Sequence, residues 1–382
     1  MSVRTFDVVV VGAGIAGAAA AQRAVELGLT TAVVEAGRPG RATTAGAGII
    51  SDYGLEDGQL HRAWLDLVRS STAEYAALMA RLGDGAERRA RYGVVGEVVL
   101  ATTDGERQEL DRFRHELDAL PLGEGRPDVQ RVTGGDLRAQ WPAIRRDLEG
   151  VSISSTARVD GSSLADLLLE RARTGGAAWF QGAARLQPGR RVTVHVGDDV
   201  LSGGTVVVAA GVWSPQLLAP LGVPLAVTPD RGQILHLAGG PEAADAPVLK
   251  TFGGPYLLGF PGPRIVIGAT HEVGGTPTPE VRAGDQLAVL QHAFAVAPGL
   301  AAHRILETRV GFRPASPDGL PLIGPVADGV SVLNGLGSWG LTLGPMLGRR
   351  LVDGLLDVDD AQQPDLGFLS PMRPDAVPAS IR

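Results

Sequence analysis

A glycine-rich turn joins the first predicted strand of this chain to its first predicted helix. Residues 6–11 form a short, mostly apolar run of β-branched residues, which predicts a strand covered on both faces of a parallel sheet. The next six residues fit the pattern GxGxxG, and they are Gly12, Ala13, Gly14, Ile15, Ala16 and Gly17. Glycines in such a turn let the backbone approach a pyrophosphate, whose charge the N–H groups at the helix start then stabilise.

An acidic residue lies at the distance that a dinucleotide site requires. A second predicted strand, residues 31–35, ends at Glu35, about twenty residues beyond the glycine turn. A carboxylate there can accept a hydrogen bond from a ribose 2′-hydroxyl, and it would repel a 2′-phosphate. The two features together predict a dinucleotide site and disfavour NADP, but they do not distinguish NAD from FAD.

Composition and charge exclude several classes of function. The chain has 382 residues, which suggests two domains or one large domain with an insertion. Its formal net charge of -7 argues against a nucleic-acid partner, because phosphate binding needs a basic face. The absence of cysteine excludes disulfides, thiolate metal sites, thiol nucleophiles and a cysteinyl flavin link. No histidine or carboxylate cluster has metal-site spacing, so we expect no metal.

The start of the chain and its apolar segments bear on location. The first strand begins almost at once, with no apolar segment and cleavage site before it, so we expect a cytoplasmic protein. No apolar run reaches about 18 residues without a glycine or a charge, so we expect no membrane span. The sequence leaves open whether the chain forms a homo-oligomer.

Strand and helix patterns alternate along the chain. Helices are predicted at 14–27, 58–82 and 106–120, and strands at 91–101, 178–181, 226–237 and 248–270. A further helix has Ser162 or Ser163 as its predicted N-cap and ends at Gly175 and Gly176. Glycines and prolines punctuate the block at 248–270, which is typical of a curved antiparallel sheet.

These elements predict an α/β fold. A Rossmann-like nucleotide-binding domain is expected from segments 1–85, 150–222 and 306–382. A mostly antiparallel β substrate domain, inserted between these segments, is expected from 86–149 and 223–305.

Two further loops suit a flat, polar-edged cofactor. Residues 37–51, GRPGRATTAGAGIIS, are rich in small and hydroxylated side chains, so backbone N–H groups and the hydroxyls of Thr43 and Thr44 could follow a pyrophosphate and a ring system. A flexible surface linker is the alternative interpretation of the same composition. Residues 206–214, VVVAAGVWS, read as a buried strand that ends in a turn of small residues.

The order of these motifs resembles that of the D-amino acid oxidase and glycine oxidase family of FAD enzymes. The glycine turn and Glu35 are followed by TTAGAGII, VVVAAGVWS, YLLGFPGPRIVIGAT, GFRPASPDGLPLIGP and NGLGSWGLTLGP. The likeness extends over most of the chain and is weakest between residues 54 and 149. It implies non-covalent FAD, two domains, and oxidation of a carbon–nitrogen bond in a small amine or amino acid.

The resemblance and the motifs together nominate the residues that contact FAD. They are Gly12, Gly14, Ile15, Ala16, Gly17, Glu35, Ala36, Thr43, Thr44, Ala45, Gly46, Gly48, Ala210, Gly211, Trp213, Gly311, Gly337, Ser338, Trp339, Gly340, Leu341 and Thr342. A reduced flavin carries negative charge near N1 and the C2 carbonyl, which needs an electropositive neighbour. Backbone N–H groups of residues 337–340, where the last helix begins, are the candidates. A glycine-rich turn that only packs strand on helix is the alternative.

Two residues are candidates for substrate binding. Arg313 follows a predicted strand at 308–312, and the matching family arginine pairs with the substrate carboxylate through its guanidinium fork. Tyr256 lies where the glycine oxidase pattern has an active-site tyrosine. A structural ion pair and a core tyrosine are the respective alternatives. His236 and His271 read as core or surface histidines.

The sequence also departs from the family pattern. Many glycine oxidases carry Pro-Arg after the active-site tyrosine, where this chain has Gly259 and Phe260, so a more apolar or roomier pocket is expected. Ser338 and Trp339 likewise stand where a basic residue is common. Lys250 does not match the flavin-side lysine of sarcosine oxidases, which leaves the acceptor open between oxygen and a quinone or carrier protein.

Four functions remain open from the sequence alone. The favoured one is an FAD enzyme that takes hydride from a neutral amine held by Arg313, so that no protein base is needed, and whose imine product hydrolyses. A D-amino acid dehydrogenase with another acceptor, or a flavin-binding protein without catalysis, would share most motifs. A nicotinamide dehydrogenase would explain the first glycine turn but not the last.

Overall fold

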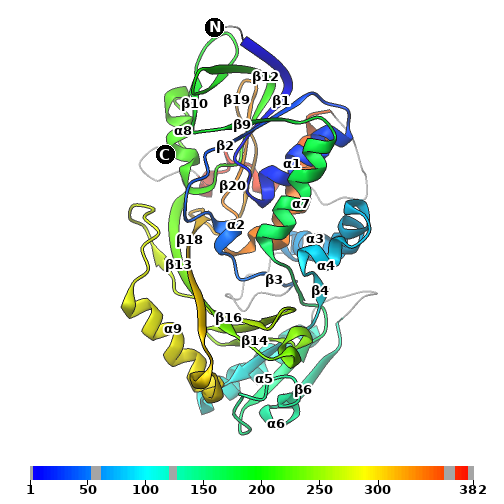
Figure 1. Ribbon diagram of the computed structural model, residues 1–382, viewed down its shortest axis with the longest axis vertical. Helices are drawn as coiled ribbons and strands as arrows, with labels where there is room; N and C mark the ends of the chain where they lie inside the picture. Colours follow the sequence, from blue (N-terminus) through cyan, green and yellow to red (C-terminus); the bar gives the residue numbers. More distant parts are fainter. Residues whose placement is uncertain (1–2, 53–61, 120–126, 357–365, 377–382) are drawn as a thin grey trace.

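Two large β-sheets and a small one organise the chain, which a computed structural model describes over residues 3–52, 62–119, 127–356 and 366–376 (Figure 1). The first sheet has eight strands: β1 (Val3–Val11), β2 (Thr31–Glu35), β9 (Ala178–Gln181), β10 (Ala184–Gln187), β11 (Thr193–Val196), β12 (Asp199–Val208), β19 (Leu322–Ala327) and β20 (Val330–Asn334). Its centre is parallel in the order β9-β2-β1-β12-β20. This is the expected Rossmann-like arrangement.

The second sheet has nine strands and is antiparallel apart from the pair β14–β5. Its strands are β5 (Glu97–Ala101), β6 (Val129–Thr133), β7 (Glu149–Ile153), β13 (Thr228–Ala238), β14 (Val248–Thr251), β15 (Tyr256–Phe260), β16 (Arg264–Gly268), β17 (Glu272–Val273) and β18 (Ile305–Ala315). The small sheet joins β3 (Ile49–Ile50), β8 (Ala157–Arg158) and β4 (Gly93–Val94). The mostly antiparallel second sheet confirms the predicted fold class; the proposed domain limits stay a prediction.

Helices cover the sheets. The longer ones are α1 (Ile15–Glu26), α3 (Arg62–Leu82), α5 (Asp104–Ala119), α7 (Gly161–Thr174), α9 (Ala283–Val296) and α10 (Gly340–Gly354). The short ones are α2 (Ala42–Ala45), α4 (Ala86–Ala90), α6 (Gly134–Leu137) and α8 (Ser214–Leu218). Residues 58–61 of the helix predicted at 58–82, and Leu120 of the one predicted at 106–120, lie outside the described residues. Among the helices described, no segment is long and apolar enough to cross a membrane.

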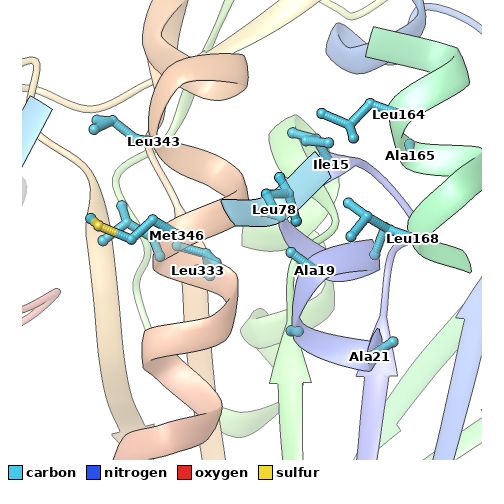
Figure 2. Packing of buried hydrophobic residues seen from close by; sticks show 14 of the residues in the cluster. Ile15, Ala19, Ala21, Leu78, Leu164, Ala165, Leu168, Leu333, Leu343 and Met346 are labelled. Carbon is cyan, nitrogen blue, oxygen red and sulfur yellow. The ribbon is translucent and has the colours of Figure 1, made fainter. Parts of the chain in front are cut away.

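Helix α1 lies between α7 and α10, and this packing fixes where its first turn lies (Figure 2). Ala18, Ala19, Ala20 and Ala21 of α1 are fully buried, and Leu168 of α7 joins the same cluster. Small side chains let the helix axes come close, because buried surfaces in proteins are tightly packed. The start of α1 is therefore held rigidly beside the C-terminal end of β1.

Three local predictions differ from the structure. The N-cap of α7 is Asp160, whose side chain accepts a 3.1 Å hydrogen bond from the Ser163 N–H, and neither Ser162 nor Ser163 caps the helix. The loop at 37–51 contains the short α2 and β3. Arg313 lies inside β18 and not after it, because the ladder with β13 continues past Phe312 to Ala315.

Candidate active site

Residues from both large sheets line one cavity with a volume of about 910 Å³. The eight-stranded side contributes the turn after β1, the end of β2, the loop around α2, the turn after β12 and the start of α10. The nine-stranded side contributes Gly232, Ile234, Lys250, Tyr256 and Arg313. Nucleotide-binding loops and a wall of charged and polar side chains therefore face the same space.

The turn after β1 has room only for glycine at two positions. Gly12 has a φ of +106°, and a Cβ built on it would lie 2.4 Å from the carbonyl oxygen of Ala209. A Cβ on Gly17 would lie 1.9 Å from the carbonyl oxygen of Gly12. The N–H of Ile15, in the first turn of α1, donates to Thr43 Oγ1 at 3.0 Å. The start of α1 thus lies against the cavity and against the α2 loop.

Glu35 is held in place at the end of β2. Its Oε2 accepts from the N–H of Ala13 at 2.7 Å, and its Oε1 accepts from the N–H of Gly37 at 2.6 Å. A carboxylate oxygen can accept more than one hydrogen bond, so both oxygens retain capacity for a ribose hydroxyl. The position lines the cavity, as a ribose-binding carboxylate must.

Most of the nominated cofactor residues line the cavity. They are Gly12, Gly14, Ile15, Ala16, Glu35, Ala36, Thr43, Ala45, Gly46, Gly48, Ala210, Gly211, Trp213, Gly311, Gly337, Ser338, Trp339, Gly340, Leu341 and Thr342. Gly17 and Thr44 do not line it. A Cβ on Gly17 would face the Gly12 carbonyl and not the cavity. The hydroxyl of Thr44 is not directed at the cavity either, because its Oγ1 donates to the Arg41 carbonyl at 3.0 Å.

The final glycine motif forms a 3₁₀ turn, Gly337–Trp339, directly before α10. The Trp339 N–H donates to the Leu336 carbonyl at 2.8 Å, so this one of the expected flavin-facing donors is already used inside the turn. The side chain of Asn334 donates to the Gly211 carbonyl at 2.9 Å, which ties this turn to the one after β12. Asn334 also lines the cavity, and sequence reasoning did not nominate it.

Arg313 is anchored by an acidic residue on the neighbouring strand. Its Nη1 donates to Asp230 Oδ2 at 3.2 Å and to the Thr270 carbonyl at 3.3 Å. Burial would raise the pKa of Asp230, but His271, whose Nδ1 lies 3.0 Å from Oδ2, and the Arg313 charge outweigh it and lower that pKa. Nη2 of Arg313 has no partner among the described residues, so it remains open to an anion in the cavity.

The guanidinium of Arg313 lies directly over Gly232. A Cβ on Gly232 would lie 2.7 Å from both Nη1 and Nη2. In the β13–β18 ladder Gly232 pairs with Gly311, and Asp230 pairs with Arg313. The two pairs are two residues apart on each strand, so they project to the same face of the sheet. A side chain at this position would displace the guanidinium from its place in the cavity wall.

Tyr256 stands beside Arg313 on the same wall. It pairs with Gly268 across β15 and β16, and a Cβ on Gly268 would lie 3.0 Å from the tyrosine Oη. Burial raises the pKa of Tyr256 to about 12, so its hydroxyl stays protonated near neutral pH and can donate a hydrogen bond. The charge of Arg313 acts in the opposite direction but is the smaller influence on this pKa.

Of the two departures noted in the sequence, the pair Ser338 and Trp339 lines the cavity and the other pair does not. Gly259 and Phe260 do not line the cavity. A Cβ on Gly259 would lie 1.7 Å from the Ala243 carbonyl oxygen, and Phe260 is 1% exposed. The expectation that this pair enlarges the pocket or makes it more apolar is therefore wrong, since neither residue lines it and Phe260 is covered by the loop at Gly48. Within the described residues, no group of three histidine, cysteine, aspartate or glutamate side chains could hold a metal ion.

These features fit FAD and define the class of the protein. The glycine turn at the start of α1, the fixed carboxylate of Glu35 and a cavity long enough to include both the α2 loop and the start of α10 suit a dinucleotide with a ring system beyond its pyrophosphate. The fold and the cavity are those of an FAD-dependent oxidoreductase. The chain belongs to the family described as DAO, FAD dependent oxidoreductase, whose model matches residues 7–354.

Individual relatives agree with this membership. The chain is 35% identical to the uncharacterized oxidoreductase YurR of Bacillus subtilis, over 90% of this chain and 93% of that protein. It is 31% identical to a glycine oxidase of Pseudomonas aeruginosa, over 91% of this chain and 93% of that one. The crystal structure of iminodiacetate oxidase from Chelativorans sp. BNC1 matches with a TM-score of 0.86 and 34% identity, covering 95% and 98% of the two chains.

Proposed function

We propose that this enzyme oxidises the carbon–nitrogen bond of a small amino acid or secondary amine. One observation carries the proposal. The guanidinium of Arg313, anchored on one side by Asp230, presents Nη2 to the same cavity that the nucleotide loops line. A guanidinium fork suits a carboxylate because it offers parallel N–H groups to both oxygens. Glycine oxidase and iminodiacetate oxidase, two of the relatives, act on substrates of this class.

The described residues supply binding and orientation. Arg313 holds the substrate carboxylate, and the protonated hydroxyl of Tyr256 donates a further hydrogen bond to it. Two fixed contacts at one end leave the Cα–H and the amine at the other end of the substrate directed away from the wall. Orientation of this kind removes much of the entropic barrier to the reaction. FAD supplies the two-electron acceptor for the hydride that leaves Cα.

The electron and proton balance needs no protein base. The amine binds in its neutral form, and its lone pair forms the C=N bond as hydride leaves Cα. Water then adds to the released imine, which yields the carbonyl product and the free amine. Oxygen is the proposed final acceptor and becomes hydrogen peroxide. Tyr256 is unsuited to act as a base, since its pKa is raised to about 12.

An anaerobic absorbance titration tests the proposal. Purified enzyme is titrated with glycine, sarcosine, iminodiacetate and a panel of D- and L-amino acids, while the flavin band near 450 nm is followed. We expect one class of compound to bleach the band and air to restore it with formation of peroxide. Bleaching that only a quinone or a dye reverses would replace oxygen by another acceptor, and no bleaching by any amine would refute the proposal.

Arg313→Ala provides the test of the substrate site. It removes the carboxylate contact and leaves the nucleotide loops intact, so the variant should keep its flavin but bleach only at far higher substrate concentration. The matched control is Arg282→Ala, since Arg282 pairs with Glu272 on the exposed surface of the same sheet. Equal behaviour of the two variants would assign Arg313 to structure only.

A further inference from the structure

Lys250 is the one lysine of the whole sequence, and it lies in the wall of the cavity. Its Nζ donates to Glu97 Oε2 at 2.7 Å and to Ser51 Oγ at 3.4 Å. An ammonium group has three N–H donors, and the third has no partner among the described residues. The side chain of Lys250 is 17% exposed and that of Glu97 is 1% exposed. The ammonium therefore lies between the buried carboxylate and the cavity.

The carboxylate of Glu97 is stabilised without help from the cavity. Its Oε2 also accepts from Ser51 Oγ at 3.0 Å and from Thr156 Oγ1 at 2.7 Å. Neither Glu97 nor the neighbouring acid Asp52 lines the cavity. An anion that approaches this part of the wall thus meets the Lys250 ammonium before it meets a carboxylate.

Lys250 and Arg313 share one arrangement. Each is a cation on the cavity wall that a buried acid on an adjacent strand anchors, Glu97 for Lys250 and Asp230 for Arg313. Each retains at least one N–H group without a partner among the described side chains and backbone. Since Arg313 is the proposed site for one carboxylate, the same arrangement at Lys250 suits a second.

The sheet register places Lys250 and Tyr256 on the same face of the sheet as the Arg313 guanidinium. Lys250 pairs with Tyr256, Tyr256 pairs with Gly268, and Gly268 pairs with Ile234, which form one row across β14, β15, β16 and β13. Residues directly opposite each other in a ladder project to the same face. Arg313 lies outside this row, on β18, and its guanidinium lies over Gly232, which is two residues along β13 from Ile234 and therefore on the same face.

We propose that Lys250 binds a second carboxylate of the substrate, and that this enzyme acts on amino or imino acids that carry two carboxylates. The proposal rests on the proposed function, because it takes Arg313 as the site of the first carboxylate. A lysine suits the role, since its compact ammonium can contact Glu97 and a substrate oxygen at once. Within this arrangement Lys250 selects the substrate and takes no part in bond breaking.

Substrate pairs that differ by one carboxylate test this selection. Iminodiacetate and sarcosine share the N-substituted glycine, and N-(2-carboxyethyl)glycine and N-ethylglycine form a second pair with one more methylene. For Lys250→Met we expect kcat/KM for a dicarboxylate to fall at least tenfold more than for its partner, mainly through KM. Lys250→Arg should restore part of the difference. Arg282→Met, which removes an exposed cation, is the control for net charge.

An equal fall within both pairs, or no fall for either dicarboxylate, would overturn the proposal and assign Lys250 to the ion pair with Glu97. Because Lys250→Met leaves Glu97 without its cation, flavin content and melting temperature are measured alongside. The wild-type enzyme offers a second test that needs no variant. Acetic anhydride has one side-chain amine to modify, and mass spectrometry reads that site directly.

We expect iminodiacetate to protect Lys250 from acetylation at concentrations where sarcosine does not. Equal protection by both compounds, or by neither, would also count against the proposal. This readout separates the two hypotheses. If no amine bleaches the flavin but iminodiacetate protects Lys250, the proposed function fails while the anion site stands. If sarcosine bleaches the flavin but iminodiacetate does not protect Lys250, the proposed function stands and the anion site at Lys250 fails.

Discussion

Gly232→Ala should weaken substrate use while leaving the fold intact. The new Cβ would lie 2.7 Å from both Nη atoms of Arg313, whereas non-bonded heavy atoms prefer about 3.5 Å or more. The guanidinium must therefore move by roughly 1 Å. The φ of Gly232 is not in the left-handed region, so alanine fits the backbone there.

The expected magnitude follows from that displacement. A hydrogen bond to a charged group contributes about 1.5–3 kcal/mol, and about 1.4 kcal/mol corresponds to a tenfold change. Loss of one such bond to the substrate carboxylate should lower kcat/KM by about 10- to 100-fold. The melting temperature should change little, because alanine restricts the unfolded chain and offsets part of any strain.

Steady-state kinetics with the best substrate of the titration, together with flavin content and thermal melting, measure these effects. Gly284→Ala is the matched control, since a Cβ at that position in α9 meets nothing within 4 Å. A fall of less than about threefold, or an equal fall in the control, would refute the assignment of Arg313 to the substrate. A fall that tracks flavin loss would refute the claim that the change is local.

Three more outcomes follow from other contacts. In Glu35→Gln, the amide NH2 group of the new side chain would face the N–H group of either Ala13 or Gly37, which should cost about 1–3 kcal/mol. The Kd for FAD should therefore rise at least several-fold, as measured by fluorescence titration of the apoprotein. Leu168→Ala, at a fully buried position of α7, should lower the unfolding free energy by about 2–5 kcal/mol in urea. Burial lowers the pKa of His236 from 6.5 to about 4. The contribution of this neutral histidine to the unfolding free energy is therefore complete above pH 6.5 and falls by up to about 3 kcal/mol toward pH 4. His236→Leu should flatten that decline, as measured by thermal melting at pH 7.5 and pH 5.

Local sequence signals predicted the nucleotide half well. The glycine turn, β2 and β9 depend on residues that are adjacent in sequence, and their bounds follow from β-branched runs and glycines. Periodicity alone could not say which face of β15 looks into the cavity. Tyr256 and Phe260 share one face of this strand, but Phe260 packs beneath Gly48, so only the three-dimensional packing shows that Phe260 does not reach the cavity.

The charged wall could not be predicted for a different reason. Arg313 meets Asp230 across 83 residues of sequence, and Lys250 meets Glu97 across 153. Each contact depends on which strands are neighbours in the nine-stranded sheet and in what register. Of these two cations, the family pattern nominated only Arg313. The position of Lys250 in the cavity wall follows only from the pairing of β14 with β15 and β5.

Both cations of this wall are paired with acids, which bears on how the cavity can attract an anion. An unpaired cation that is buried to this extent would lose hydration at a cost of several kcal/mol. The ion pairs with Asp230 and Glu97 offset this cost for Arg313 and Lys250. The pairs are neutral, and what they present to the cavity is a small number of oriented N–H donors. Recognition then depends on direction more than on net charge. An anion is held only where its oxygens meet those donors, and this is the physical basis on which one wall could distinguish two carboxylates from one.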